Sequence, residues 1–260
     1  MTEQDAAKGL VTPFMRGLRL LRYIAEGGAT GNLSEVGRLI DVNRVTVMRL
    51  LATLEHEGLI ERLPQGGHRV GTAFMTLAAS ALSSFDLLAE GRNAIEQLSR
   101  ELKVSAYMVV LEGYQAVYVH RAMPEGGLVS HIRVGSRVSA FLTAPGRILL
   151  SQLSSAQVQE LWQQWQESQP QEFASASLEF THVMQQLQED AQRGHVWSFS
   201  GYEQGINACA AGIKWRDDRH AAALSVVAAQ PLFDADASLA GRMQESVQSA
   251  ARQLSRVAGF

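Results

Sequence analysis

The sequence predicts an α+β protein that consists of a winged helix-turn-helix domain, a linker helix and a larger domain whose antiparallel sheet is flanked by helices. Three observations support this prediction. Two short amphipathic helical patterns follow one another across a tight turn in residues 33–57. A hairpin pattern with a Pro-Gln-Gly-Gly turn comes next, at residues 59–71. From about residue 90 onward, hairpins and late strands are mixed with helices, which is typical of an antiparallel sheet.

The same patterns give the expected domain boundaries. We expect a flexible N-terminus at residues 1–13, the winged helix-turn-helix at 14–72, the linker helix at 73–90 and the larger domain at 91–260. The chain has 260 residues, of which 46% are apolar, so it can bury a sizeable core.

The helix-turn-helix pattern begins at Leu33. Ser34, next to Glu35 and ahead of an apolar pattern, is a candidate N-cap for a short first helix. A three-residue turn at 41–43 separates this helix from a second one. The apolar residues of the second helix lie on one face: Val47, Leu50, Leu51 and Leu54. Its other face carries arginine and short polar side chains, as the recognition helix of a DNA-binding protein does.

Two further segments extend this pattern. The stretch "RGLRLLRYIAEGG" predicts a preceding helix whose arginines are available to the DNA backbone. The stretches "LIERL" and "HRVG" predict a wing that lies along the phosphates, where His68 and Arg69 can touch them. The predicted DNA-binding residues are Arg16, Arg19, Ser34, Asn43, Arg44, Val45, Thr46, Arg49, His68 and Arg69. A winged helix can also serve as a protein-binding module, and that alternative stays open.

The larger domain alternates between strand and helix patterns. Strands are predicted on both sides of a Glu112–Gly113 turn and again at 128–135. Further on, helices are predicted at 144–153, 155–166 and 177–193, strands at 195–200, 208–215 and 221–229, and a last helix at about 236–257. The glutamine-rich stretch 162–173 is expected to be a helix end followed by an exposed loop.

Composition and motifs exclude several classes of protein. There is no run of about 18 apolar residues and no signal-peptide pattern, so we expect a cytoplasmic protein without membrane contact. The single cysteine, Cys209, allows no internal disulfide and is expected to be a buried small side chain. No H-E-x-x-H or G-x-S-x-G pattern occurs, and no Walker-type or G-x-G-x-x-G loop follows a predicted strand. We therefore predict no catalytic residue, metal site or cofactor.

Charge is unevenly distributed between the two predicted domains. Residues 14–72 carry eight basic and six acidic side chains, whereas residues 73–260 carry 14 basic and 18 acidic ones. This small asymmetry is compatible with DNA binding by the first domain.

Five blocks of the sequence resemble the IclR family of bacterial transcriptional regulators, over nearly the whole chain. They are "RGLRLLRYIAEGG", "LSEVGRLIDVNRVTVMRLLATLEHEGLIERL", "HRVGTAFMTLA", "VGSRV…TAPGRILL" and "GINACAAGI…AAALSVVA". The resemblance implies a winged helix-turn-helix, a linker helix that helps the chain dimerise, and an effector-binding domain with a GAF-like sheet. It also implies operator DNA and a small metabolite as partners, a homodimer or homotetramer, and association with the nucleoid when DNA is bound.

The resemblance further implies an effector pocket. The residues at its positions are Val134, Gly135, Phe141, Leu142, Thr143, Ala144, Ser198, Tyr202, Asn207, Ala208, Ser225 and Val227. Several of these depart from the family pattern: Phe141 replaces a histidine, Ala208 a cysteine or serine, Ser198 an aspartate and Val227 a serine. Pro145 also removes a main-chain donor. Because all but one of these exchanges remove polar character, we expect an aromatic or otherwise apolar effector rather than a short keto-acid.

Other departures and alternatives concern both domains. Asp41 stands where the family has a glycine in the helix-turn-helix turn, and Val45 stands where a serine is common. Thr143 is a candidate N-cap of the following helix, with Pro145 in its first turn. Phe141 and Val227 could be core residues only, and the protein could be a ligand-independent interaction or architectural DNA-binding module. Repression and activation are both compatible with the sequence.

Overall fold

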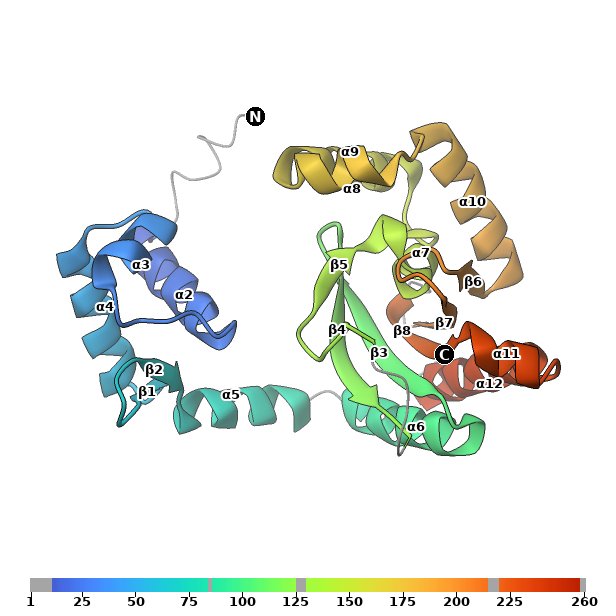
Figure 1. Cartoon of the computed structure of the whole chain (residues 1–260), viewed down its shortest axis with the longest axis horizontal. Helices are drawn as coiled ribbons and strands as arrows, with labels where there is room; N and C mark the ends of the chain where they lie inside the picture. The colour runs from blue at the N-terminus through green and yellow to red at the C-terminus, as the bar shows by residue number, and fades with distance from the viewer. Residues whose placement is uncertain (1–10, 84–85, 125–129, 215–219, 258–260) are drawn as a thin grey trace. The chain divides into compact units, whose positions relative to one another are not determined.

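The computed structural model describes residues 11–83, 86–124, 130–214 and 220–257 (Figure 1). The chain divides into two compact units, Met1–Phe85 and Asp86–Phe260, which we call unit 1 and unit 2. Most of the predicted flexible segment 1–13 lies outside the described residues, and the first described helix begins at Thr12.

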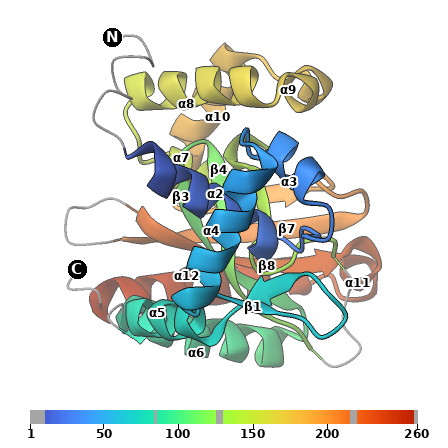
Figure 2. The same cartoon turned by 90° about the vertical axis from the view of Figure 1, so that its left-hand side faces the viewer.

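Unit 1 has the helices and the hairpin that the sequence predicts. Its elements are α2 (Thr12–Ala25), α3 (Leu33–Leu39), α4 (Arg44–His56), β1 (Ile60–Arg62), β2 (His68–Val70) and α5 (Thr72–Ser83). In Figure 2, α2, α3 and α4 lie together, and the antiparallel β1–β2 hairpin follows the end of α4. Leu20, Val47 and Ile60 are almost completely buried between these elements. The inward apolar faces of the helices therefore form one core.

The turn between α3 and α4 depends on two positions. Asp41 has a φ of +56°, in the left-handed region that favours glycine but accepts aspartate better than most residues. Gly37 packs against the main chain of Val42, where a Cβ at Gly37 would lie 2.5 Å from the Val42 carbonyl oxygen. The turn therefore accepts aspartate at position 41 and requires glycine at position 37.

Asparagine caps both helices of this motif. Asn32 Oδ1 accepts hydrogen bonds from the main-chain N–H groups of Ser34 (3.2 Å) and Glu35 (3.3 Å). Asn43 Oδ1 accepts one from the N–H of Thr46 (2.8 Å). The prediction that Ser34 is the N-cap is wrong, because α3 begins at Leu33 and Ser34 lies in its first turn.

Unit 2 is built on an antiparallel sheet with helices on both faces. Its described strands are β3 (Ser105–Glu112), β4 (Gln115–Ala122), β5 (Arg137–Ser139), β6 (Val196–Phe199), β7 (Ile206–Lys214) and β8 (His220–Ala229), and they lie in the order β5-β4-β3-β8-β7-β6. Its described helices are α6 (Asp86–Leu102), the 3-10 turn η2 (Ala140–Leu142), α7 (Ala144–Leu150), α8 (Ser155–Ser168), α9 (Pro170–Ala176), α10 (Phe180–Arg193), α11 (Gln230–Ala235) and α12 (Leu239–Val257).

Two cores lie on opposite faces of this sheet. Strand β3 shows the separation, because Tyr107 belongs to one core and Met108 to the other. Helices α7 and α10 cover the first face, and α6 and α12 cover the second (Figure 1). In the β3–β8 register, Tyr107 lies opposite Ser225 and Ser105 lies opposite Val227. These side chains therefore share the face toward α7.

Two predicted elements differ from the structure. The described part of the predicted strand 128–135 is not a strand, because Gly135 has a φ of +90° and the N–H of Arg133 donates to the Ser136 hydroxyl (2.9 Å), which closes a turn before β5. The predicted linker helix 73–90 corresponds to α5 and the start of α6, with residues 84–85 between them outside the described part of the chain.

The glutamine-rich stretch 162–173 is helical and part of the core rather than an exposed loop. Helix α8 continues to Ser168 and α9 follows almost at once. Trp165 is completely buried and lies 5.0 Å from Phe173, centroid to centroid. The apolar residues of the stretch therefore indicate its burial better than its glutamine content does.

Candidate functional site

The outer face of α4 is a candidate nucleic-acid interface. Arg44, Val45 and Arg49 are exposed on it, and Thr46 is partly exposed. In the described part of the chain, neither arginine side chain forms an ion pair. Val45 is 61% exposed, so an apolar contact to a base edge is available beside the two guanidinium groups. This face can thus combine charged and apolar contacts.

A shallow hollow lies at the start of α4. Its lining combines Arg16 from α2 and Arg38 from α3 with residues of the turn and of α4, namely Gly37, Asp41, Val42, Asn43 and Thr46. Two guanidinium groups against the one carboxylate of Asp41, beside a helix N-terminus, favour a negatively charged group such as a phosphate. The sequence pattern singled out Arg16 and not Arg38. Arg19 and Ser34 lie elsewhere on the exposed surface of unit 1.

The wing differs from the prediction at His68. Its Nδ1 is 2.7 Å from the Thr30 hydroxyl and its Nε2 is 2.7 Å from Glu55 Oε1. The His68 side chain is only 7% exposed. Both ring nitrogens are therefore engaged inside unit 1, and His68 is not available to a phosphate. Arg69 is exposed and donates two hydrogen bonds to Glu61 (3.1 and 2.9 Å) across the wing.

A pocket opens in unit 2 on the face toward α7, where strands β3, β4, β7 and β8 meet the start of that helix. Seven of the predicted effector residues line it: Thr143, Ala144, Ser198, Tyr202, Ala208, Ser225 and Val227. Its volume of about 40 Å³ holds only a few water molecules. Binding of a ring compound therefore requires side chains at the mouth, such as the 44% exposed Tyr202, to move.

Five predicted effector residues do not line this pocket. Phe141 is 4% exposed, stacks on Trp165 (5.4 Å) and meets Trp162 edge-on (5.1 Å), so it is a core residue. Leu142 packs against the same core. Asn207 is buried and bonds to the Gln230 side chain (2.7 Å) and the N–H of Ser200 (3.1 Å). Val134 and Gly135 lie on the exposed turn before β5.

The pocket also contains residues that the sequence pattern missed, listed here: Tyr107, Tyr118, Ser130, Ile132, Glu203 and Ile206. The most unexpected of them is Glu203. Its Oε2 accepts a hydrogen bond from the Ser130 hydroxyl (2.8 Å), and its Oε1 accepts one from the N–H of His131 (2.9 Å). The carboxylate thus joins the turn after β6 to the segment before β5, across 72 residues of sequence.

Two tyrosines form an inner wall of the pocket. Their rings meet edge-on, with 5.5 Å between the centroids of Tyr107 and Tyr118. Burial raises the pKa of Tyr118 well above its usual value, and a hydrogen bond with Thr143 only partly offsets this. The hydroxyl of Tyr107 is buried and has no hydrogen-bond partner among the described residues. The Tyr118 phenol is therefore uncharged near neutral pH.

The start of α7 forms another wall of the pocket. Its N-cap is Thr143, as the sequence predicts. The Thr143 hydroxyl accepts a hydrogen bond from the N–H of Gly146 (3.2 Å), and Pro145 lies in the first turn and lines the pocket. A Cβ at Gly146 would lie 2.3 Å from the carbonyl oxygen of Ala140. The close approach of η2 to α7 therefore depends on this glycine.

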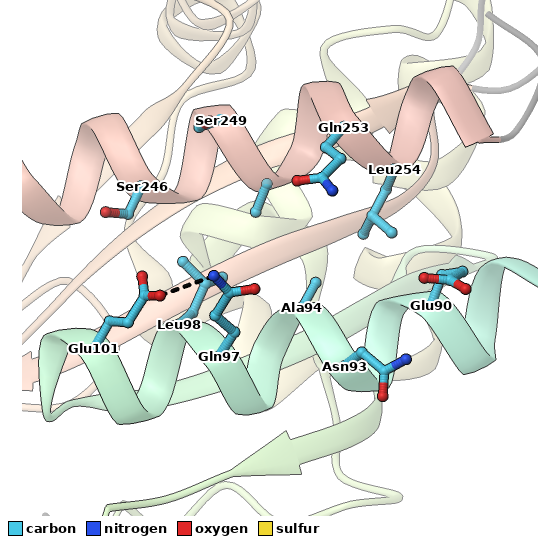
Figure 3. A pocket seen from close by; sticks show the side chains of 11 residues that line it. Glu90, Asn93, Ala94, Gln97, Leu98, Glu101, Ser246, Ser249, Gln253 and Leu254 are labelled. Atoms are coloured by element: carbon cyan, nitrogen blue, oxygen red, sulfur yellow. Dashed lines mark hydrogen bonds between the residues drawn. The ribbon is translucent and has the colours of Figure 1, made fainter.

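A second depression lies on the opposite face of the sheet, between α6 and α12 (Figure 3). It has a volume of about 260 Å³. Polar side chains surround it, including Glu90 and Glu101, and Gln97 donates a hydrogen bond to Glu101 (2.8 Å). It lacks the aromatic walls of the first pocket, so we place the candidate ligand site on the α7 face.

Three further features of the described residues concern metal binding, membrane spans and thiol chemistry. The described residues include no group of three or more histidine, cysteine, aspartate or glutamate side chains that could hold a metal ion. None of the described helices is long and apolar enough to cross a membrane. Cys209 is completely buried, and burial raises the pKa of its thiol to about 12, so it is an unreactive core side chain.

Known proteins resemble both units. The family model "Bacterial transcriptional regulator IclR C-terminal" matches residues 79–256, and the "IclR helix-turn-helix domain" model matches residues 14–64. The chain is similar to the HTH-type transcriptional regulator XynR of Escherichia coli K12, with 26% identity over 247 residues that cover 94% of this chain and 96% of XynR.

Solved structures share the fold. An IclR transcriptional regulator from Alicyclobacillus acidocaldarius has a TM-score of 0.82 at 21% identity, covering 96% of this chain and 100% of its own. An IclR homologue from Microbacterium hydrocarbonoxydans, crystallised in complex with 4-hydroxybenzoate, has a TM-score of 0.77 at 18% identity, covering 94% of this chain and 99% of its own.

Proposed function

Because the chain belongs to the IclR family of bacterial transcriptional regulators, we propose that it is a sequence-specific operator-binding protein whose DNA affinity is controlled by a small aromatic or otherwise apolar metabolite. Its relatives are named as regulators of transcription, and it is not an enzyme. The observation that carries the proposal is the pairing of an exposed arginine-bearing helix in unit 1 with an aromatic-walled pocket in unit 2.

In unit 1, α4 enters the major groove of the operator. Arg44, Thr46 and Arg49 contact base edges, and Val45 contacts a thymine methyl group or a neighbouring apolar edge. Arg16, Arg38 and Arg19 contact phosphates, which set the orientation of the helix on the duplex. Asn43 serves mainly as the cap of α4, and Arg69 extends from the wing to the adjacent phosphates.

In unit 2, the effector occupies the pocket in front of α7. The rings of Tyr107, Tyr118 and Tyr202 provide aromatic contact area, and Ser225 and Thr143 provide polar groups that orient a substituent. The complex of the Microbacterium homologue with 4-hydroxybenzoate supports a single-ring aromatic compound. Binding or release of this ligand changes operator affinity.

The active form is a homodimer or a homotetramer in the cytoplasm, associated with the nucleoid when it is bound to DNA. Large apolar side chains that are exposed on the single chain support an oligomer. Phe14 and Leu18 on α2 are 67% and 48% exposed, and Met75 and Leu77 on α5 are 63% and 62% exposed. Such surfaces are commonly covered by a partner.

Fluorescence anisotropy tests the proposal with labelled DNA from upstream of the protein's own gene. We expect binding about a thousandfold tighter than to unrelated DNA of equal length. Phenol, benzyl alcohol, 4-hydroxybenzoate and pyruvate are added in turn, and an aromatic compound is expected to shift the operator affinity by about 5- to 150-fold. Equal affinity for both DNAs would contradict operator binding. Specific binding that none of the compounds changes would favour a ligand-independent architectural protein.

A further inference from the structure

We propose that the unit 2 pocket selects an uncharged aromatic compound that carries a hydroxyl group and rejects aromatic carboxylates. The inference rests on the function proposed above and names the class of its effector. The proposed class excludes 4-hydroxybenzoate, the carboxylate with which the Microbacterium homologue was crystallised. Three features of the pocket carry it: the carboxylate of Glu203, the hydroxyl of Tyr107 and the lack of a lining cation.

Glu203 places a negative charge in the wall of the pocket. Both oxygens of its carboxylate accept hydrogen bonds, from the buried Ser130 hydroxyl (2.8 Å) and from the N–H of His131 (2.9 Å). A ligand carboxylate in the same small space would be repelled, whereas a ligand hydroxyl can donate to the remaining lone pairs of Glu203.

Tyr107 offers a second polar contact at the inner end of the pocket. The residue is 1% exposed, it lines the pocket, and its hydroxyl has no partner within the described ranges. An unpaired buried hydroxyl is costly, and a ligand hydroxyl can pair with it as donor or acceptor. The Tyr107 and Tyr118 rings leave an aromatic wall beside this contact, which suits a single-ring compound.

The described lining of the pocket has no positive charge to bind an anion. No arginine, lysine or histidine belongs to its described lining. The guanidinium of Arg121 donates from Nη1 to the main-chain carbonyl oxygen of the lining residue Ile132 (3.0 Å), and Arg121 itself is not part of the described lining. Pro145 removes a main-chain donor from the first turn of α7, and the N–H of Gly146 is already bonded to Thr143. The described lining therefore offers a ligand a carboxylate and hydroxyl groups but no cationic side chain.

Isothermal titration of the full-length protein with two matched probes tests this inference. The probes are 4-hydroxybenzyl alcohol and 4-hydroxybenzoate, which share a phenol ring. The first carries a neutral hydroxymethyl group at the position where the second carries a carboxylate. We expect the alcohol to bind at least about tenfold more tightly at neutral pH. In Glu203→Gln, the difference should shrink to about threefold or less, because 4-hydroxybenzoate gains affinity. Glu160→Gln, an exposed residue of α8, is the matched control and should keep the wild-type preference.

A second variant covers the possibility that Glu203→Gln fails to fold. Tyr107→Phe removes a hydroxyl that has no hydrogen-bond partner among the described residues, so the thermal midpoint should stay the same or rise. Affinity for 4-hydroxybenzyl alcohol should nevertheless fall by about fivefold or more. A lower thermal midpoint with unchanged affinity would show a purely structural role for this hydroxyl and would overturn its part in binding.

The outcomes separate this inference from the proposed function. Wild-type protein that binds 4-hydroxybenzoate as tightly as the alcohol, or more tightly, overturns the selectivity and leaves effector control intact. If neither probe binds, the inference is also wrong, and the anisotropy experiment with the wider set of compounds decides separately whether a ligand controls operator binding.

Discussion

The two units present their functional side chains in opposite ways. In unit 1 the candidate DNA contacts are exposed and lie on one helix and its flanking turn, with Arg44, Val45 and Arg49 within two turns of α4. In unit 2 the candidate ligand contacts are largely buried and come from strands and turns between Tyr107 and Val227. A DNA-reading surface can thus be separate from the core of its unit, whereas the wall of the pocket is also part of the core.

The largest expected effect tests how closely the pocket is joined to the core of unit 2. Phe141→Ala should lower the free energy of unfolding of unit 2 by about 3–5 kcal/mol, because it leaves a cavity between Trp162 and Trp165. Denaturant titration followed by tryptophan fluorescence measures it selectively, because all four tryptophans lie in unit 2.

Phe199→Ala is the control for this variant. Phe199 is 64% exposed and stacks only on Trp197 in the described structure, so its loss should cost at most about 1.5 kcal/mol. A stable Phe141→Ala protein that had lost its response to the ligand would contradict the core assignment and return Phe141 to the pocket.

Most of unit 1 could be predicted from the sequence because its contacts are local. Apolar spacing identified the helices, the Pro-Gln-Gly-Gly turn identified the wing, and Asp41 adopts the left-handed conformation that its position requires. The errors concern contacts that periodicity does not encode. Ser34 and Asn32 are equally good candidate N-caps until the first residue of α3 is known. The hydrogen bond between His68 and Thr30 joins residues that are 38 positions apart in the sequence.

Less of the pocket could be predicted, because its walls meet only through the order of the strands. Thr143 and Ser225 were identified because they lie in blocks that resemble a known family. Tyr107 faces Ser225 through the β3–β8 register, and no local pattern marks that pairing. Glu203 lies in a turn whose only sequence signal is an acidic side chain near Gly205. The glutamines around Trp162 and Trp165 gave this stretch a polar composition, so the aromatic cluster that buries Phe141 was not predicted.

The second prediction tests whether His68, which the sequence pattern assigned to DNA binding, instead stabilises the fold of unit 1. His68→Ala should lower the free energy of unfolding of unit 1 by about 2–3 kcal/mol, because it removes two hydrogen bonds and leaves the buried Thr30 hydroxyl unpaired. Hydrogen exchange of α4 amides measures it, since unit 1 contains no tryptophan.

His56→Ala is the matched control, because His56 is exposed in the last turn of α4, and the hydrogen bonds to the Thr30 and Glu55 side chains in the described structure come from His68. It should leave exchange rates almost unchanged. If His68→Ala instead weakened DNA binding and did not change exchange, His68 would contact the phosphate directly, as the sequence pattern suggested.

The third prediction concerns an exposed residue of unit 1 whose loss should leave the core of that unit unchanged. Arg49→Ala should weaken operator binding by about 1–3 kcal/mol and relax sequence preference at the contacted base pair, because the guanidinium reads a base edge. Neither the unfolding free energy of unit 1 nor ligand affinity in unit 2 should change. Anisotropy against a set of single-base operator variants measures the effect, with Arg252→Ala on the exposed surface of α12 as the control. A uniform loss across all the DNA variants would show a phosphate contact instead.

The smallest expected effect separates two roles of one residue, Asn43. Asn43→Ala should cost about 1 kcal/mol of stability, because the N–H of Thr46 loses its cap. Asn43→Asp keeps an acceptor for that N–H and places a negative charge at the N-terminus of α4, so stability should be retained.

The same charge faces the hollow that holds Arg16 and Arg38, where it competes with a phosphate. Operator affinity of Asn43→Asp should therefore fall while hydrogen exchange of α4 stays at the wild-type rate. Equal losses of stability in both variants would mean that the cap needs the amide itself.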